Sequence, residues 1–261
     1  MQAMLNIAVR AARKAGDIIA RACDQVDTLK VRHKAENDFV SEIDHRAEQA
    51  VIDTLLKAYP DHAILAEESG SHGEGEYQWL IDPLDGTTNF LHGFPQYAVS
   101  IACRHKQQLQ HAVVYDPIKQ ELFTASRGEG AQLNGKRIRI SQRTSLSGAL
   151  LGTGIPFSDV DTLDIHLRMM RDIIPGTAGI RRAGSAALDL AYVAAGRLDG
   201  FWEFRLKPWD MAAGILLVEE AGGLAGDFHG GFDYFTSGNI ICANPRIFKQ
   251  MLKILKPHVP A

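Results

Sequence analysis

Cysteine is scarce in this sequence. The 261 residues include only Cys23, Cys103 and Cys242, which are widely separated. An odd number of cysteines without a close pair predicts neither a disulfide framework nor a zinc site, and it fits a reducing compartment. We therefore expect an intracellular, cytoplasmic protein.

Long apolar runs and an excess of one charge are also missing. The run Met211–Val218 is far shorter than the roughly 20 residues of a membrane-spanning helix. Arg10, Arg13 and Lys14 interrupt the N-terminal segment at helical spacing, which predicts a mature helix and not a signal peptide. With 28 Lys+Arg against 31 Asp+Glu, the net charge is −3, so coating nucleic acid is not the expected main function. The composition, 46% hydrophobic and 23% charged, is that of a globular protein and excludes disorder, collagen and coiled coil.

Helical and strand patterns are mixed along the chain. Apolar spacings of three and four predict a helix over 4–23 and a second one beginning after Ser41, where Ser41 and Asp44 have capping-box spacing. Apolar or alternating runs predict strands over 63–66, 79–82, 97–104, 111–115, 121–125, 149–153, 179–182 and 199–204. Further helices are predicted over 161–174, 185–196 and 209–221 and from 245 onwards. This mixture predicts a layered α+β or α/β chain.

One phosphate-binding pattern is a false match. The segment from Gly130 to Lys136 has the spacing of a P-loop, but Arg137 follows where a Ser or Thr hydroxyl is needed for Mg²⁺. Asn134-Gly135 between alternating residues instead predicts a hairpin turn.

The informative stretch is Trp79–Asn89. Asp82 stands at the end of an apolar run, and Pro83 after it disfavours a helix. We therefore expect Asp85 to project from a turn toward the same point as Asp82. The following Gly86-Thr87 can begin a helix or tight turn whose N–H groups hold a phosphate. The alternative is an ordinary Asp-Pro turn with a capping aspartate.

Two more carboxylates stand at the ends of predicted elements. Glu67 follows an apolar run, and Asp210 begins an apolar helix. Taken singly, Glu67 reads as a solvated strand end and Asp210 as a helix cap. Together with Asp82 and Asp85 they describe a site for a hard cation with oxygen ligands, since without cations the carboxylates would repel one another.

These residues resemble a known family. The stretches Trp79–Phe90 and Trp209–Gly223 are similar to the two signature stretches of the inositol monophosphatase family, and Ala66–Gly70 is similar to its first metal-binding segment. The stretch Arg181–Gly196 resembles the bacterial SuhB-type branch, and the similarity runs from about residue 4 to 255. The resemblance implies the five-layer αβαβα sandwich of the inositol monophosphatase and fructose-1,6-bisphosphatase superfamily, an α+β fold that is usually a homodimer. It also implies a single domain over 1–261, with most metal ligands in a half of about 1–145 and a second half of about 146–261.

The resemblance also implies roles for individual residues. It places two or three Mg²⁺, with Li⁺ as an inhibitor, on the side chains of Glu67, Asp82, Asp85 and Asp210 and the carbonyl of Leu84. Thr87 with Asp44 would orient and deprotonate the attacking water, and Glu67 is the third implied catalytic residue. It further implies contacts with the substrate from Leu84, Asp85, Gly86, Thr87, Arg181, Gly184, Ser185, Ala186, Glu203 and Asp210. Among these, the Gly86 and Thr87 amides would hold the phosphate and Glu203 a polyol hydroxyl. Lys34 matches a basic residue near the phosphate, although its spacing to Asp38 departs from the family pattern. Purely structural alternatives remain: Asp44 and Ser185 can be helix caps, and Arg181 can be a surface charge.

The implied function is Mg²⁺-dependent hydrolysis of a small polyol phosphomonoester, first of all myo-inositol 1-phosphate, by metal-activated water. Alternative substrates are fructose 1,6-bisphosphate and nucleotide phosphates. A haloacid-dehalogenase phosphatase, with an aspartate nucleophile, is the nearest enzymatic rival, but the Asp-x-x-Asp spacing differs from its motif. A non-enzymatic alternative is transcription antitermination through RNA polymerase and Nus factors, to which the basic residues Lys136, Arg137, Arg139, Arg143, Arg181 and Arg182 could contribute.

Overall fold

The structure is a computed structural model that describes residues 2–23, 31–35, 38–157 and 159–260, with 2, 31–35 and 38–40 described by their backbone only. The helices are α1 (Gln2–Ala22), α2 (Glu42–Ala58), α3 (Thr87–Leu91), α4 (Val160–Ile173), α5 (Ala186–Ala194), α6 (Pro208–Glu220), α7 (Tyr234–Ser237), α8 (Pro245–Leu255) and the 3-10 helix η2 (Lys256–His258). The strands are β1 (Val31–Ala35), β2 (Asp38–Ser41), β3 (Ala63–Ala66), β4 (Gly70–His72), β5 (Tyr77–Asp85), β6 (Ala98–His105), β7 (Gln108–Asp116), β8 (Glu121–Ser126), β9 (Gly130–Leu133), β10 (Lys136–Arg137), β11 (Leu150–Thr153), β12 (Gly179–Arg181), β13 (Gly200–Glu203), β14 (Leu224–Gly226) and β15 (Ile240–Ala243).

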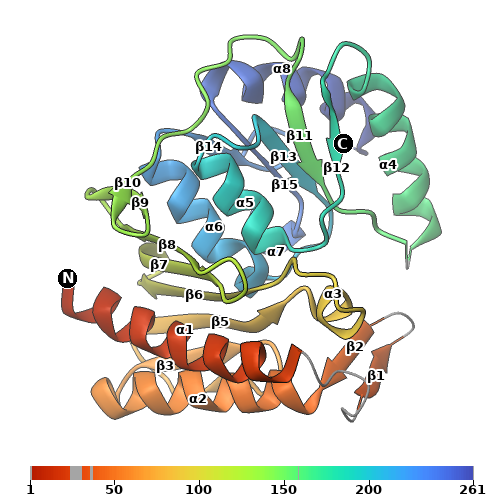
Figure 1. Ribbon diagram of the computed structural model, residues 1–261. Helices are drawn as coiled ribbons and strands as arrows, with labels where there is room; N and C mark the ends of the chain where they lie inside the picture. The colour runs from red at the N-terminus through yellow and green to blue at the C-terminus, as the bar shows by residue number, and fades with distance from the viewer. Residues whose placement is uncertain (1, 24–30, 36–37, 158, 261) are drawn as a thin grey trace.

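Helices and sheets alternate in five layers (Figure 1). Helices α1 and α2 cover one face of an eight-stranded sheet, and α5 and α6 lie between its other face and a five-stranded sheet. Helices α4 and α8 cover the outer face of the second sheet. The αβαβα sandwich expected from the sequence is thereby confirmed.

The two sheets differ in their strand directions. The larger sheet has the order β10-β9-β8-β7-β6-β5-β3-β4 and is antiparallel except for the parallel pair β3 and β5. The smaller has the order β12-β11-β13-β15-β14, with β11 parallel to both β12 and β13. The two-stranded ribbon of β1 and β2 stands apart from both.

The central helices are apolar on all sides because they are covered on both sides. In α6, every residue from Met211 to Val218 is buried, and α5 buries eight of its nine residues. A helix without a polar face needs such an enclosed position. One hydrophobic cluster joins Leu80 and Val114 of the first sheet to Leu216 of α6 and Phe201 of the second sheet.

Most predicted elements lie within a few residues of the observed ones. The capping box of α2 is present, with Ser41 Oγ accepting from the Ile43 N–H and Asp44 Oδ2 accepting from the Ser41 N–H. Asn134 and Gly135 both have positive φ between β9 and β10, which confirms the hairpin and excludes the P-loop. No helix in the described part of the chain is long and apolar enough to cross a membrane.

Candidate functional site

A cavity of about 170 Å³ lies where the two halves of the chain meet. It is bordered by the C-terminal ends of β3, β5, β11 and β13 and by the N-terminal ends of α3, α5 and α6. The cavity is lined by Glu67, Asp82, Leu84, Asp85, Gly86, Thr87, Thr153, Gly154, Arg182, Gly184, Ser185, Ala186, Asp189, Glu203, Leu206 and Asp210.

A β-bulge turns Asp82 and Asp85 to the same side of the sheet. Asp82 pairs with Ser100 and Asp85 with Ala98, so β5 has one more residue between them than β6. Because side chains alternate along a strand, three positions would otherwise place the two carboxylates on opposite faces. The expectation that Asp85 projects from a turn was therefore wrong: Asp85 ends β5. Pro83 lies inside the bulge, where its missing N–H is tolerated.

Asp85 links the two halves of the chain. Its Oδ2 accepts hydrogen bonds from Ser185 Oγ at 2.6 Å and from the Ala187 N–H at 2.7 Å. Ser185 also accepts from the Leu188 N–H and caps α5. The capping role and the site role that the sequence left as alternatives for Ser185 are thus combined in one side chain.

Carboxylates from both halves face this cavity. Burial raises the pKa of Asp82, which is 2% exposed, and Glu67, Asp85 and Asp210 raise it further by repulsion. Burial also raises the pKa of Asp85 to about 6, and it raises that of Asp210, where repulsion from Asp85 adds to the effect. Asp85, Asp210 and Glu67 are only half-buried and reach the solvent in the cavity. Within the described residues, no three His, Cys, Asp or Glu side chains already form a compact metal cluster.

Thr87 and Asp44 lie together at the edge of the cavity. Thr87 Oγ1 is 2.9 Å from Asp44 Oδ1 and 3.1 Å from the Leu84 carbonyl oxygen. The other carboxylate oxygen of Asp44 accepts from the Ser41 N–H and from Ser41 Oγ. Asp44 is therefore a capping residue of α2 and also a partner of the Thr87 hydroxyl.

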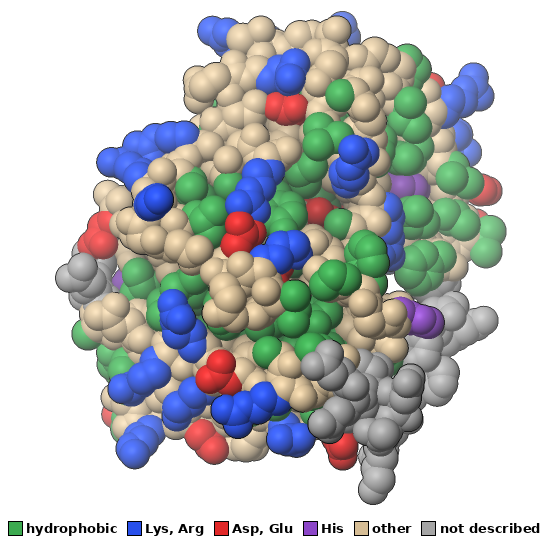
Figure 2. Space-filling view, viewed as in Figure 1, with side chains coloured by type: hydrophobic (Ala, Val, Ile, Leu, Met, Phe, Trp, Pro, Cys, Tyr) green, Lys and Arg blue, Asp and Glu red, His purple; other side chains and the backbone are tan. Residues whose placement is uncertain are grey.

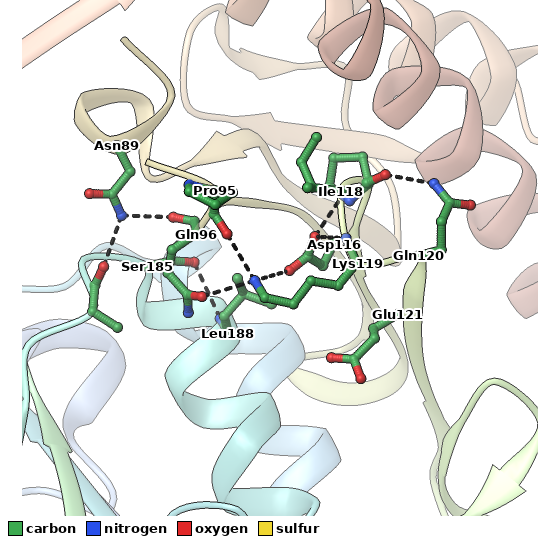
Figure 3. A network of polar contacts seen from close by, with 12 residues as sticks. Asn89, Pro95, Gln96, Asp116, Ile118, Lys119, Gln120, Glu121, Ser185 and Leu188 are labelled. Atoms are coloured by element: carbon green, nitrogen blue, oxygen red, sulfur yellow. Dashed lines mark hydrogen bonds and ion pairs between the residues drawn. The ribbon is translucent and has the colours of Figure 1, made fainter. Parts of the chain in front are cut away.

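The loop around Gly86 is packed tightly between the two halves. Gly86 has a φ of +102°, and a Cβ at this position would lie 2.9 Å from the Gln96 carbonyl oxygen, so glycine is required. Asn89 Nδ2 donates to the carbonyls of Gln96 and Ala183 at 2.7 and 2.8 Å, which ties the loop to the segment that precedes α5 (Figure 3). Lys119 Nζ donates to the Pro95 carbonyl and to Gln96 Oε1, and is paired with the buried Asp116 (Figure 3).

Glu203 is a further carboxylate that lines the cavity. It ends β13, and burial raises its pKa to about 8, with smaller contributions from Asp189 and Asp85. The backbone of Gly154, which follows β11, lies against its carboxylate.

Two predicted residues are not found at the cavity, one because it lies elsewhere and one because its side chain is not described. Arg181 is exposed and donates to the Ile180 carbonyl, whereas its neighbour Arg182 lines the cavity and lies 5.3 Å from the Phe157 ring centroid. The structure therefore does not bring Arg181 to the cavity. Lys34 lies in β1, whose side chains are outside the described residues.

Sequence reasoning missed Arg182, Thr153, Gly154, Leu206 and Asp189, all of which line the cavity. For Asp189 a signal was available, because it is the only charged residue of α5 and its helical neighbours are almost all apolar. A lone acidic residue in a fully buried helix indicates a special role more often than a solvated surface position.

Comparisons with known proteins identify relatives over the whole length of the chain. Residues 1–259 match the model of the inositol monophosphatase family. The chain is 58% identical to the Nus factor SuhB of Pseudomonas aeruginosa over 266 residues, covering 100% of this chain and 98% of the relative. Its fold is similar to that of the extragenic suppressor protein suhB from Bartonella henselae, with a TM-score of 0.95, 46% identity and coverage of 98% and 100%. It is also similar to the inositol monophosphatase from Anabaena, with a TM-score of 0.85, 37% identity and coverage of 99% and 97%.

Proposed function

Because the chain belongs to the inositol monophosphatase family, we propose that it hydrolyses a small polyol phosphomonoester with Mg²⁺, and that myo-inositol 1-phosphate is its first candidate substrate. The observation that carries the proposal is the meeting of Glu67, Asp82, Asp85 and Asp210, which come from both halves of the chain, at one cavity beside the Gly86-Thr87 loop.

The donor set suits Mg²⁺. Carboxylate and carbonyl oxygens are the ligands that this ion prefers, and the repulsion that raises the pKa of Asp82 and Asp210 is relieved by a cation. Two or three ions would be held by the side chains of Glu67, Asp82, Asp85 and Asp210 and the carbonyl of Leu84. When bound, Mg²⁺ would make a water molecule more acidic and stabilise the charge of the phosphate and of the leaving oxygen.

The chain itself supplies the path for the proton of the attacking water. When the Thr87 hydroxyl donates to Asp44 Oδ1 at 2.9 Å, its lone pairs remain available to accept a hydrogen bond from the attacking water, so Thr87 can take the water proton as its own proton passes to Asp44. Asp44 is held by the N-terminus of α2 and by Ser41, so it is oriented before substrate arrives. We assign Asp44, Thr87 and Glu67 to activation of the water and the Gly86 and Thr87 amides to the phosphate.

The size of the cavity favours a compact alcohol. A volume of about 170 Å³ is below the roughly 300 Å³ at which pockets for drug-sized ligands begin. Glu203, Gly184, Ser185 and Ala186 line the same cavity as the phosphate loop, and we place the alcohol against them. This favours inositol phosphate over fructose 1,6-bisphosphate and nucleotide phosphates.

The direct test is phosphate release with Mg²⁺ from inositol 1-phosphate, fructose 1,6-bisphosphate and adenosine 3′,5′-bisphosphate. We expect the highest kcat/KM for inositol 1-phosphate, no activity with chelator, inhibition by Li⁺, and no trapped aspartyl-phosphate. Covalent phosphate on an aspartate would favour the haloacid-dehalogenase mechanism instead. Higher activity on one of the bisphosphates would overturn the choice of substrate.

A second candidate function is a regulatory contact with RNA polymerase and Nus factors. It is supported by the name Nus factor SuhB of the Pseudomonas relative. It is also supported by Lys and Arg side chains that gather over the hairpin of β9 and β10, where Lys136, Arg137 and Arg139 are exposed (Figure 2). Binding of the transcription machinery by an Asp85→Asn protein would show that this role is separable from catalysis, whereas loss of binding by the folded variant would indicate a surface coupled to the metals.

We also propose a homodimer located in the cytoplasm. Light scattering on the purified protein tests the first part, since a mass near that of one chain would contradict it. Cell fractionation tests the second.

A further inference from the structure

Asp189 is a buried carboxylate at the cavity that the proposed reaction does not use. It belongs to α5, its side chain is 1% exposed, and it lines the same cavity as Glu203. Its Oδ1 accepts no hydrogen bond from any residue that the structure describes. A buried acceptor without a partner is rare, because removing it from water without compensation is unfavourable.

A purely structural role does not account for this residue. Asp189 lies in the first turn of α5, where an acidic side chain favours the helix, but that turn already has Ser185 as its cap. Burial and repulsion from Asp85 raise the pKa of Asp189, Arg182 opposes this only in part, and no ion pair joins Arg182 and Asp189 among the described residues. The positions around it, Leu188, Leu190 and Ala191, are apolar and buried, so an apolar side chain would be the simpler choice for stability.

Asp189 and Glu203 border the same short segment at the end of β11. A Cβ at Gly152 would lie 3.6 Å from Asp189 Cγ, and a Cβ at Gly154 would overlap the Glu203 carboxylate. The two carboxyl groups therefore approach the same short backbone segment, and both line the one cavity.

We propose that Asp189 is a specificity residue that accepts a hydrogen bond from a free hydroxyl of the substrate alcohol, beside the hydroxyl that Glu203 binds. This inference rests on the proposed function. It narrows the substrate class to phosphomonoesters whose alcohol carries at least two free hydroxyl groups. An alcohol without them would leave the Oδ1 atom unpaired in the complex, and such a mismatch is rejected strongly.

The test compares two substrates that differ only in hydroxyl groups, myo-inositol 1-phosphate and cyclohexyl phosphate. For each we would measure kcat/KM with Mg²⁺ in the unaltered protein, in Asp189→Ala and in the isosteric Asp189→Asn. The ratio of the two kcat/KM values should fall by about tenfold or more in Asp189→Ala, the effect of one lost hydrogen bond to a buried group. Asp189→Asn keeps an acceptor oxygen and should restore most of the ratio.

Equal losses on both substrates, or equal losses of selectivity in the two variants, would overturn the proposal and assign Asp189 a structural role. Circular dichroism and the melting temperature report whether the variants fold. If Asp189→Ala does not fold, the two substrates are compared in the unaltered protein alone. A kcat/KM for inositol 1-phosphate that is less than about tenfold above that for cyclohexyl phosphate overturns the proposal.

Failure of the proposed function has a different signature. A chain that releases phosphate from neither substrate is not the phosphatase proposed above. Calorimetric titration of free myo-inositol then tests Asp189 alone: weaker binding by Asp189→Ala than by Asp189→Asn supports its role, and equal binding, or none by the unaltered protein, refutes it.

Discussion

Gly154 should control the position of Glu203, and Gly154→Ala tests this directly. A Cβ at residue 154 would lie 2.6 Å from Glu203 Oε2 and closer still to Oε1 and Cδ, whereas real Cβ atoms stay at least 3.0 Å from such neighbours. The carboxylate must therefore move. The φ of Gly154 lies outside the left-handed region, so its backbone accepts alanine and the conflict is confined to Glu203.

The expected effect is large on activity and small on stability. The overlap requires a displacement on the order of 1 Å, and misplacement of a substrate-binding group by that much lowers activity by about a hundredfold. Alanine stabilises the fold by about 0.4–1 kcal/mol because it restricts the unfolded chain, which offsets part of the rearrangement around Glu203. The melting temperature should therefore change by no more than about 4 °C.

The assay is kcat/KM for inositol 1-phosphate in a double-mutant cycle with Glu203→Ala. If Gly154 acts through Glu203, the second substitution should add little once the carboxylate is gone. A hundredfold loss in both backgrounds would refute the reasoning, because Gly154 would then act independently of Glu203. Full activity of Gly154→Ala alone would refute it as well.

Three further predictions concern the metal site, acid stability and cooperativity. Asp85→Asn should lower Mg²⁺-dependent phosphate release by at least about a thousandfold while circular dichroism stays unchanged; substantial turnover would contradict the ligand assignment. Burial lowers the pKa of His166 to about 4, so as the pH falls from 6.5 toward 4 the unfolded chain takes up the proton first and stability is lost. Relative to His166→Phe, the unfolding free energy measured in urea should fall by about 2–3 kcal/mol between pH 7 and pH 4.5, and parallel pH profiles would contradict this. We also propose one domain, since one hydrophobic cluster joins both sheets. Unfolding followed by the fluorescence of Trp79, in a chain with Trp202 and Trp209 replaced by Phe, should coincide with unfolding followed by Trp202 and Trp209 in a Trp79→Phe chain. Two midpoints would indicate two domains.

The elements of the fold were predictable because their signals are local. Ser41 and Asp44 show the start of α2, and the unbroken apolar run after Asp210 shows a helix that is covered on both sides. The strand Leu224–Gly226 was missed because it is short and contains glycine, and Ile240–Ala243 was missed because four apolar residues alone do not distinguish a buried strand from other buried structure. The five layers followed from the family resemblance alone, since layer number depends on contacts between distant segments.

The site was predictable to the extent that its residues sit at the ends of elements. Glu67, Asp82, Asp85 and Asp210 each end or begin an apolar segment, and this position brings them to one cavity. The bulge between Asp82 and Asp85 could not be predicted, because it is a property of the pairing between β5 and β6. The same limit explains why Arg181 was predicted at the cavity while Arg182 is found there. Arg181 ends β12 and Arg182 follows it, and adjacent residues point in different directions. Which of them faces the cavity depends on where the strand lies in its sheet. Residues such as Asp189 and Gly154 are defined by what lies across from them, so their roles follow from the assembled sheets and helices, and substitutions there should alter selectivity more than folding.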